Sequence, residues 1–227
     1  MHTNSAISAR IPAAVALRGA ANMQPAGTPT AGQPRMLAKG EELFAEGDPA
    51  DYFYKVVSGS IRTCKLLSDG RRQIDAFHLP GDIFGLEAGP EYRFTAEALG
   101  DATLVAFRRS RLAELTAADP AFANQVLASM MKCLGRAQDH MLLLGRKTAQ
   151  EKIATFLLDM AKRISSDDGE HVELPMQRSD IADHLGLTIE TVSRTLTCFA
   201  RQGLIRLQAG SRSVDLCNMA ALRQLDA

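Results

Sequence analysis

The sequence predicts an α+β protein in which a jelly-roll-like β-roll, one long α-helix and a small C-terminal domain of helices and a β-hairpin follow a tail. Three observations predict this order. Short strand-like runs between glycines fill the first half of the chain, apolar residues at heptad spacing come next, and two short helical patterns precede a hairpin pattern in the last third. The expected divisions of the 227 residues are 1–34, 35–118, 119–145 and 146–227.

The first division is predicted to be a disordered tail. Residues 1–34 are rich in Ala, Pro, Gly, Thr and Ser, a composition that buries little apolar surface. A targeting peptide is the less favoured alternative, because Pro12 interrupts the apolar run 11–17 and no convincing basic start precedes that run.

Composition limits the classes of function. No apolar run approaches the roughly 20 residues of a membrane span, so we expect no membrane partner. Lys plus Arg number 26, as do Asp plus Glu, so any surface that binds a polyanion must be local. The four cysteines are widely scattered, form no CxxC pair and indicate no disulfide framework, which suits a reducing cytoplasm. No metal site is expected. Metal chemistry in the roll would need clustered His and carboxylates, and the roll region holds one histidine, His78, so we do not expect an enzyme.

The β-roll is predicted from regularly spaced turns. Ser58-Gly59 and Asp69-Gly70 separate three strand-like runs, which is typical of a β-sandwich or roll. Glycines recur every seven to twelve residues through this region, at Gly40, Gly47, Gly59, Gly70 and Gly81.

The long helix is predicted to begin at Asp119-Pro120, because Asp is a good N-cap and Pro suits the first helical position. Its apolar residues alternate in steps of four and three, as in a coiled-coil seam. The seam is formed by Ala123, Leu127, Met130, Leu134, Ala137, Met141 and Leu144. It predicts a homodimer interface, from Leu127 to Leu144. The alternative is a helix packed on the roll, and the two are compatible because Val126 and Cys133 form a second apolar edge. Gly145 is expected to end the helix and to serve as a hinge.

The last third predicts a winged helix-turn-helix. An amphipathic helix over 147–164 comes first. The spacing of three residues matches two helices that cross closely at a tight turn. These residues are the small Ala182, Gly186 four positions later and Val192 six positions after that. Thr195 departs from the pattern, because a larger aliphatic residue is usual there. Residues 203–216 then predict a β-hairpin, the wing, with its turn at Ala209-Gly210-Ser211.

One face of the second helix has the chemistry to read double-stranded DNA. Ile189, Glu190, Ser193 and Arg194 lie together near the N-terminal end, which enters the major groove in such motifs. Arg194 matches the two acceptors of guanine, and the carboxylate of Glu190 matches the amino group of cytosine. Alternatively, Glu190 only complements the helix dipole; the serine and arginine one turn on favour base reading.

Further residues are weaker candidates. Contacts to DNA phosphates are predicted for Arg178, Thr188, Thr197 and Arg212. The alternative for each arginine is an ordinary surface residue. For His184 a solvated surface position is favoured, and a phosphate contact is the alternative. Cys198 follows Arg194 by one turn and is a candidate redox site, although a half-buried inert thiol is favoured. Cys64 and His78 are interpreted as core or surface residues rather than haem ligands.

The segment "GLTIETVSRTLTCFARQGLI" resembles the recognition region of the CRP/FNR superfamily of bacterial transcription regulators. Its Glu190, Ser193 and Arg194 have the form of the FNR and FixK branches, and residues 79–99 are similar to the roll of FixK-type proteins. The resemblance covers nearly all of 35–227. It implies a β-roll sensor domain, a dimerisation helix, and a homodimer on inverted repeats of TTGAT-like half-sites. It also implies activation through contact with RNA polymerase, for which the loop Phe84–Glu91 is a candidate.

The chain departs from two members of that superfamily. Residues 1–63 contain no cysteine, so the iron-sulfur cluster of FNR is not expected. Arg93-Phe94 stands where CRP has an Arg-Ser pair, and phenylalanine cannot donate a hydrogen bond to the phosphate of cyclic AMP. The resemblance therefore implies a FixK-like activator without a cofactor, controlling low-oxygen or nitrogen-fixation genes. The alternative is a sensor gated by haem or another ligand.

Overall fold

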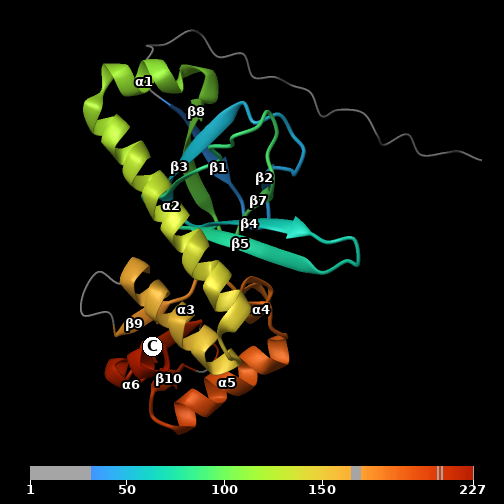
Figure 1. The fold of residues 1–227 in the computed structure, drawn as a ribbon, viewed down its shortest axis with the longest axis vertical. Helices are drawn as coiled ribbons and strands as arrows, with labels where there is room; N and C mark the ends of the chain where they lie inside the picture. Colours follow the sequence, from blue (N-terminus) through green and yellow to red (C-terminus); the bar gives the residue numbers. More distant parts are fainter. Residues whose placement is uncertain (1–31, 165–169, 209, 211, 227) are drawn as a thin grey trace, which may run out of the picture. The chain divides into compact units, whose positions relative to one another are not determined.

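The computed structural model describes residues 32–164, 170–208, 210 and 212–226. It confirms the predicted α+β architecture, with a β-roll, one long helix and a winged helix-turn-helix in chain order (Figure 1). The expected tail lies almost wholly outside the described residues. Strand pairing already begins at Gln33, two residues before the expected start of the roll, because Gln33 and Pro34 pair with Ala106 and Val105.

The roll consists of two four-stranded antiparallel sheets, in the orders β1-β8-β3-β6 and β2-β7-β4-β5. Aromatic rings fill the space between them, and Phe44 stacks on Tyr92 with ring centroids 3.6 Å apart. The strands are β1 (Gln33–Leu37), β2 (Glu42–Phe44), β3 (Tyr52–Ser58), β4 (Ile61–Leu66), β5 (Arg72–His78), β6 (Ile83–Phe84), β7 (Thr95–Ala98) and β8 (Ala102–Arg108). The predicted turns at Ser58-Gly59 and Asp69-Gly70 are confirmed. Gly59 has a φ of 76°, and a Cβ there would lie 2.4 Å from the carbonyl oxygen of Asp101.

Two short helical segments precede the long helix and were not predicted from the sequence. They are the 3-10 helix η1 (Arg109–Arg111) and α1 (Leu112–Ala118). Leu115 is buried against Phe53 and Val126. A seven-residue helix has too few turns for its apolar period to stand out in the sequence, and tertiary packing stabilises it.

The long helix α2 (Pro120–Arg146) begins as predicted. The carboxylate of Asp119 accepts hydrogen bonds from the backbone N–H groups of Ala121 and Phe122, at 2.9 and 3.1 Å. Gly145 lies inside the last turn, so the prediction that it ends the helix is wrong. The helix continues to Arg146 and is followed by Lys147, whose backbone is extended and whose ammonium group donates to Asp226 Oδ1 over 2.7 Å.

The C-terminal domain packs around one apolar core that contains Ile153, Leu185, Val192 and Phe199. Its helices are α3 (Ala149–Ile164), α4 (Arg178–Leu185), α5 (Ile189–Arg201) and α6 (Met219–Asp226). Its sheet has the order β10-β11-β9, formed by β9 (His171–Glu173), β10 (Ile205–Leu207) and β11 (Ser213–Leu216). The predicted hairpin is confirmed as the pair β10 and β11, and Ala209 and Ser211 of its turn lie outside the described residues.

Candidate DNA interface

The helix-turn-helix is formed by α4 and α5. The backbone N–H of Gln177 donates to Asp180 Oδ2 over 2.9 Å and closes the start of α4. Gly186 ends α4 in the left-handed conformation, at φ 61° and ψ 42°, and its N–H donates to the carbonyl of Ala182. The two helices therefore cross at a small buried residue and turn at a glycine, as the spacing predicts.

The turn sets the direction of α5, and the burial of α5 sets which face is free. Thr188 caps the helix through its hydroxyl, which accepts from the Thr191 N–H over 3.2 Å. Val192, Leu196 and Phe199 are buried in the domain core. Thr195 is also buried, so the smaller residue at this position still faces inward.

The four residues predicted to read bases share the opposite face of α5. Ile189, Glu190 and Arg194 are exposed and Ser193 is half-buried. The hydroxyl of Ser193 lies 3.4 Å from a guanidinium nitrogen of Arg178. The structure thus brings these side chains to one surface at the N-terminal half of the helix. Their contacts with bases remain a prediction.

The carboxyl group of Glu190 is held in its ionised form. Its own backbone N–H and the hydroxyl of Thr188 lower its pKa below the usual value. An ionised carboxylate accepts hydrogen bonds and donates none, so Glu190 suits the amino group of cytosine and opposes acceptor edges and phosphates. The same first-turn position also complements the helix dipole, so this geometry is compatible with both interpretations.

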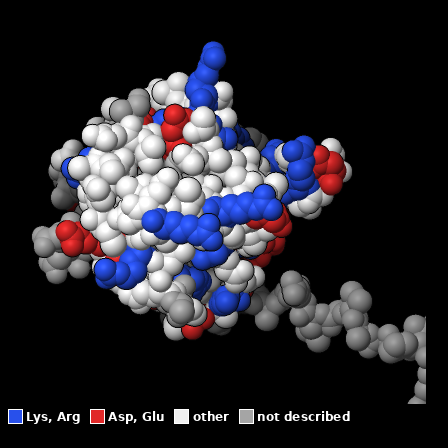
Figure 2. All heavy atoms as spheres, turned by 90° about the horizontal axis from the view of Figure 1, so that it is seen from below, with Lys and Arg blue, Asp and Glu red and all other residues white. Residues whose placement is uncertain are grey.

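The four residues predicted to contact DNA phosphates differ in whether their polar groups already form hydrogen bonds within the protein. Arg178 is exposed at the first position of α4. Arg212 is exposed too, and one of its nitrogens donates to the Pro175 carbonyl over 2.8 Å. The Thr188 hydroxyl caps α5, and the Thr197 hydroxyl donates to the Ser193 carbonyl over 2.8 Å. Figure 2 shows Lys and Arg side chains running across the face seen from below, with few Asp or Glu among them, so a basic surface exists despite the zero net charge.

The candidate redox and haem-ligand residues lie in the half-buried or buried parts of the molecule. Cys198 is half-buried on α5, and Cys64 is buried in the roll. His78 is buried and stacks on Phe84, with ring centroids 4.3 Å apart. Phe84 is itself buried, so the candidate polymerase loop does not offer its first residue as a surface contact.

His184 was expected on the solvated surface, and that expectation is wrong. Its ring Nδ1 bonds to the Ile74 carbonyl of the roll at 3.1 Å, and its ring stacks on His140 at 4.1 Å. Burial lowers its pKa to about 3. The sequence of α4 shows a polar outer face but not that strand β5 covers part of it.

The predicted seam forms an uncovered apolar stripe on α2. The exposed fractions are 60% for Leu127, 52% for Met130, 55% for Leu134, 67% for Met141 and 37% for Leu144. Ala137 is exposed as well, whereas Val126 on the second edge is buried against the roll. Cys133, the other predicted member of the second edge, is exposed, so the roll covers that edge only around Val126. The homodimer remains a prediction.

The fold and this surface define a class of protein: a transcription regulator in which a β-roll is joined through a long helix to a winged helix-turn-helix. Residues 34–119 match the model of the cyclic nucleotide-binding domain, and residues 151–225 match that of the Crp-like helix-turn-helix domain. The chain belongs to the CRP/FNR superfamily, as a FixK/FNR-type DNA-binding regulator.

Relatives of known name support this assignment. The chain is 51% identical to the nitrogen fixation regulation protein FixK of Azorhizobium caulinodans over 199 residues, which cover 86% of this chain and 80% of that protein. It is 44% identical to FixK of Rhizobium meliloti, with coverages of 85% and 88%. The solved structure of FixK2 from Bradyrhizobium japonicum superposes with a TM-score of 0.79 at 48% identity, over 86% of this chain and 98% of that one. Within the described residues, no helix is long and apolar enough to span a membrane.

Proposed function

We propose that the protein is a homodimeric transcription activator that binds inverted repeats of the form TTGAT-N4-ATCAA. The observation that carries this proposal is the exposed face of Glu190, Ser193 and Arg194 at the N-terminal half of α5. Arg194 holds the guanine and Glu190 the cytosine of one G·C pair in each half-site. Ile189, exposed at the first position of the helix, contacts a thymine methyl group.

A homodimer supplies this face twice. Each half-site occupies one major-groove segment, and symmetric half-sites about one DNA turn apart require two recognition helices related by a two-fold axis. The stripe of exposed leucines and methionines on α2 is the surface that forms this dimer. Contact with RNA polymerase then activates transcription, and the loop after Phe84 remains our candidate for it.

The protein needs neither an iron-sulfur cluster nor cyclic AMP. Residues 1–63 hold no cysteine to ligate a cluster. The guanidinium of Arg93 lies over the ring of Phe94, 5.6 Å from its centroid, and 3.9 Å from the carboxylate of Glu87. A carboxylate and an aromatic ring are therefore its neighbours, and Phe94 provides no hydroxyl for a phosphate. In the cytoplasm, such a regulator acts on low-oxygen or nitrogen-fixation genes, in keeping with the names of the FixK relatives.

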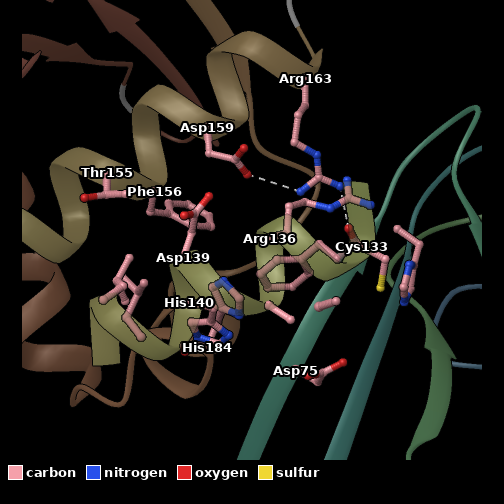
Figure 3. Close-up of a pocket in the computed structure, with 16 residues that line it drawn as sticks. Asp75, Cys133, Arg136, Asp139, His140, Thr155, Phe156, Asp159, Arg163 and His184 are labelled. Atoms are coloured by element: carbon pink, nitrogen blue, oxygen red, sulfur yellow. Dashed lines mark hydrogen bonds and ion pairs between the residues drawn. The ribbon is translucent and has the colours of Figure 1, made fainter. Parts of the chain in front are cut away.

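One observation favours a second candidate, a regulator gated by a small molecule. A cavity of about 150 Å³ lies between strand β5, α2 and α3 (Figure 3). Phe77, Leu143 and Phe156 form apolar walls, and His140 and His184 line one side. A cavity of this size accommodates a ligand no larger than about one aromatic ring.

A gel-shift assay with purified protein separates the two candidates. We expect the protein alone to retard a TTGAT-N4-ATCAA duplex in reductant, and to bind a duplex with scrambled half-sites much more weakly. The Arg194→Ala variant should lose this preference, because it removes a contact worth roughly 1–3 kcal/mol in each half-site. Unchanged selectivity of the variant contradicts the proposal. Binding that appears only after a small molecule is added supports the gated regulator.

A further inference from the structure

A cluster of charged side chains fastens α4 to the roll, and Asp180 is its centre. This carboxylate is only 4% exposed. Its Oδ1 accepts from Arg62 Nη1 at 2.7 Å and from Arg72 Nη2 at 2.8 Å, while its Oδ2 accepts from the Gln177 N–H. Arg62 lies on β4 and Arg72 on β5, so one buried carboxylate of the DNA-binding domain is held by two neighbouring strands of the other domain.

Two more carboxylates complete the cluster. Arg72 Nε donates to Asp183 Oδ2 over 2.9 Å, so Arg72 bridges two acidic residues one turn apart on α4. Arg62 Nε donates to Glu97 Oε2 over 2.8 Å, which orients Arg62 from within the roll. We call Arg62, Arg72, Asp180 and Asp183 the latch. Its contacts join residues more than 100 positions apart in the chain.

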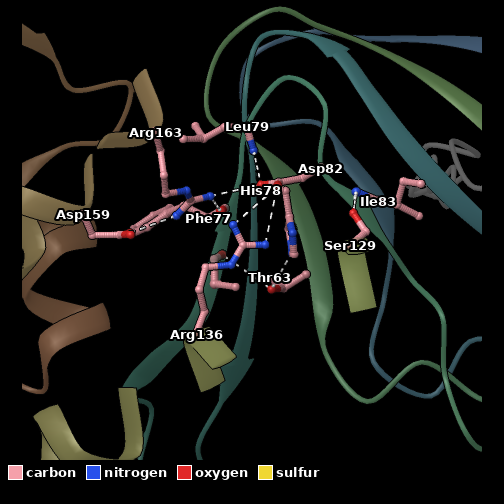
Figure 4. Close-up of polar contacts among 11 residues, drawn as sticks. Thr63, Phe77, His78, Leu79, Asp82, Ile83, Ser129, Arg136, Asp159 and Arg163 are labelled. Carbon is pink, nitrogen blue, oxygen red and sulfur yellow. Dashed lines mark hydrogen bonds and ion pairs between the residues drawn. The ribbon is translucent and has the colours of Figure 1, made fainter. Parts of the chain in front are cut away.

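A second anchor lies at Asp82 of the roll (Figure 4). Asp82 Oδ2 accepts from Arg163 Nη2 of α3 at 3.0 Å, and Asp82 Oδ1 accepts from Arg136 Nη1 of α2 at 3.3 Å. Arg163 also donates to the Phe77 carbonyl over 2.6 Å. The DNA-binding domain is therefore tied to the roll through two helices, α3 and α4. These two ties and the covalent link at Lys147 together oppose rotation of the domain on the roll.

The latch favours the docked arrangement specifically. In the docked arrangement the carboxylate of Asp180 is buried, and the two arginines compensate its charge. If the domain separated from the roll, water would solvate this carboxylate instead. A buried carboxylate that loses its cations is strongly destabilising, because its charge is left uncompensated. Removing the arginines should therefore weaken docking without unfolding the C-terminal domain, because neither arginine belongs to its apolar core.

The docked arrangement is compatible with DNA binding. The latch uses α4, whereas Ile189, Glu190 and Arg194 on α5 stay exposed. Two recognition helices must also lie one DNA turn apart. In a dimer joined through α2, this spacing is set by how each DNA-binding domain sits on its own roll. A domain free to rotate about the extended backbone at Lys147 would have to lose that freedom on binding, which lowers affinity.

We infer that Arg62 and Arg72, two residues of the β-roll, are positioning residues for DNA binding: through Asp180 and Asp183 they hold the recognition helix in the orientation that matches the inverted repeat. This inference rests on the proposed function. It assigns to the β4–β5 hairpin a role in setting DNA affinity that requires no ligand.

The test compares neighbouring arginines of one hairpin in the full chain. Arg72→Gln and the double variant Arg62→Gln/Arg72→Gln should bind the inverted repeat roughly 5- to 150-fold more weakly, the usual range of coupling between distant sites. Arg71→Gln is the matched control, because Arg71 carries the same charge, is 77% exposed and pairs with Asp69 in the turn. Its affinity should equal that of the wild type. Arg72→Lys keeps the charge and should recover part of the affinity.

Two further readouts separate positioning from other effects. The salt dependence of binding should keep its slope in Arg72→Gln, because Arg72 neutralises no phosphate. Small-angle X-ray scattering without DNA should show a broader distribution of interatomic distances in the double variant than in Arg71→Gln. Equal scattering, or equal DNA affinity, in these two proteins would overturn the inference. Failure of the wild type to bind the repeat would refute the proposed function instead, and the scattering comparison would still decide whether the latch holds the domain.

Discussion

The guanidinium of Arg178 lies 3.4 Å from the hydroxyl of Ser193, so the first residue of α4 touches the predicted reading face of α5. Arg178 therefore stands at the edge of that face, where the phosphates beside the contacted bases would lie. We predict that Arg178→Ala weakens binding about equally on all sequences. It should reduce the slope of log affinity against log salt by about 1 per subunit, since one phosphate contact is lost.

The measurement is a titration of the duplex at several salt concentrations. Arg111→Ala serves as the control, because Arg111 pairs with Glu114 of α1, and α1 lies at the opposite end of the view in Figure 1 from α5. An unchanged salt slope in Arg178→Ala would remove Arg178 from the set of phosphate contacts.

From the ionised carboxylate of Glu190 we predict an effect on the sequence specificity of DNA binding. In Glu190→Ala, we expect the preference for the G·C pair over other pairs at that position to fall by about 1–3 kcal/mol. Total affinity should fall less, because a negative charge facing DNA is also removed. Competition assays with duplexes substituted at that pair measure the effect. Glu173→Ala removes an exposed carboxylate of β9 in the same domain and should leave the preference intact; equal behaviour of the two variants would favour the helix-dipole interpretation.

The apolar stripe on α2 predicts the oligomeric state. Lysines at Leu134 and Met141 would place charges in the centre of the predicted seam, so Leu134→Lys/Met141→Lys should be a monomer with weak DNA affinity. Light scattering coupled to size exclusion measures the mass directly. Lys132→Glu changes the charge of an exposed α2 residue outside the heptad series and should remain dimeric. A double variant with dimer mass would show that the seam lies elsewhere.

The buried ring of His78 predicts how stability depends on pH. Burial lowers its pKa from 6.5 to about 3, so between these values the unfolded chain binds a proton that the folded chain does not. The contribution is therefore fully present above about pH 6.5. As the pH falls below that value, the free energy of unfolding should decrease by up to about 1.4 kcal/mol per unit from this residue.

His78→Gln keeps a hydrogen-bonding partner for Thr63, which lies 3.1 Å from His78 Nε2, and removes the titrating group. Urea denaturation at pH 7.5, 6.0 and 5.0 should show a smaller loss of stability in the variant. Part of the loss should remain, because His184 has a pKa of about 3 for the same reason. Parallel curves for the two proteins would contradict this account of His78.

The sequence by itself determined the features that depend on local patterns. Turns that contain glycine predicted strands β3, β4 and β5, and Asp119-Pro120 predicted the start of α2. The spacing of Ala182, Gly186 and Val192 marked the helix-turn-helix. The candidate reading face was also predictable, because all its residues lie within two turns of one helix, where the helical period alone decides which side chains share a surface.

Only the tertiary structure decided what lies against each element. Periodicity shows that a face is buried or polar, but not which distant segment meets it. His184 was therefore expected on the surface of α4, whereas its ring contacts strand β5. Asp180 of the same helix is buried against Arg62 of β4 and Arg72 of β5. Arg62 and Asp180 are 118 residues apart in the chain, and their ion pair exists only because the two domains dock. Gly145 stays helical for a similar reason: the chain turns where the distant Asp226 holds Lys147, not where the local helix propensity is lowest.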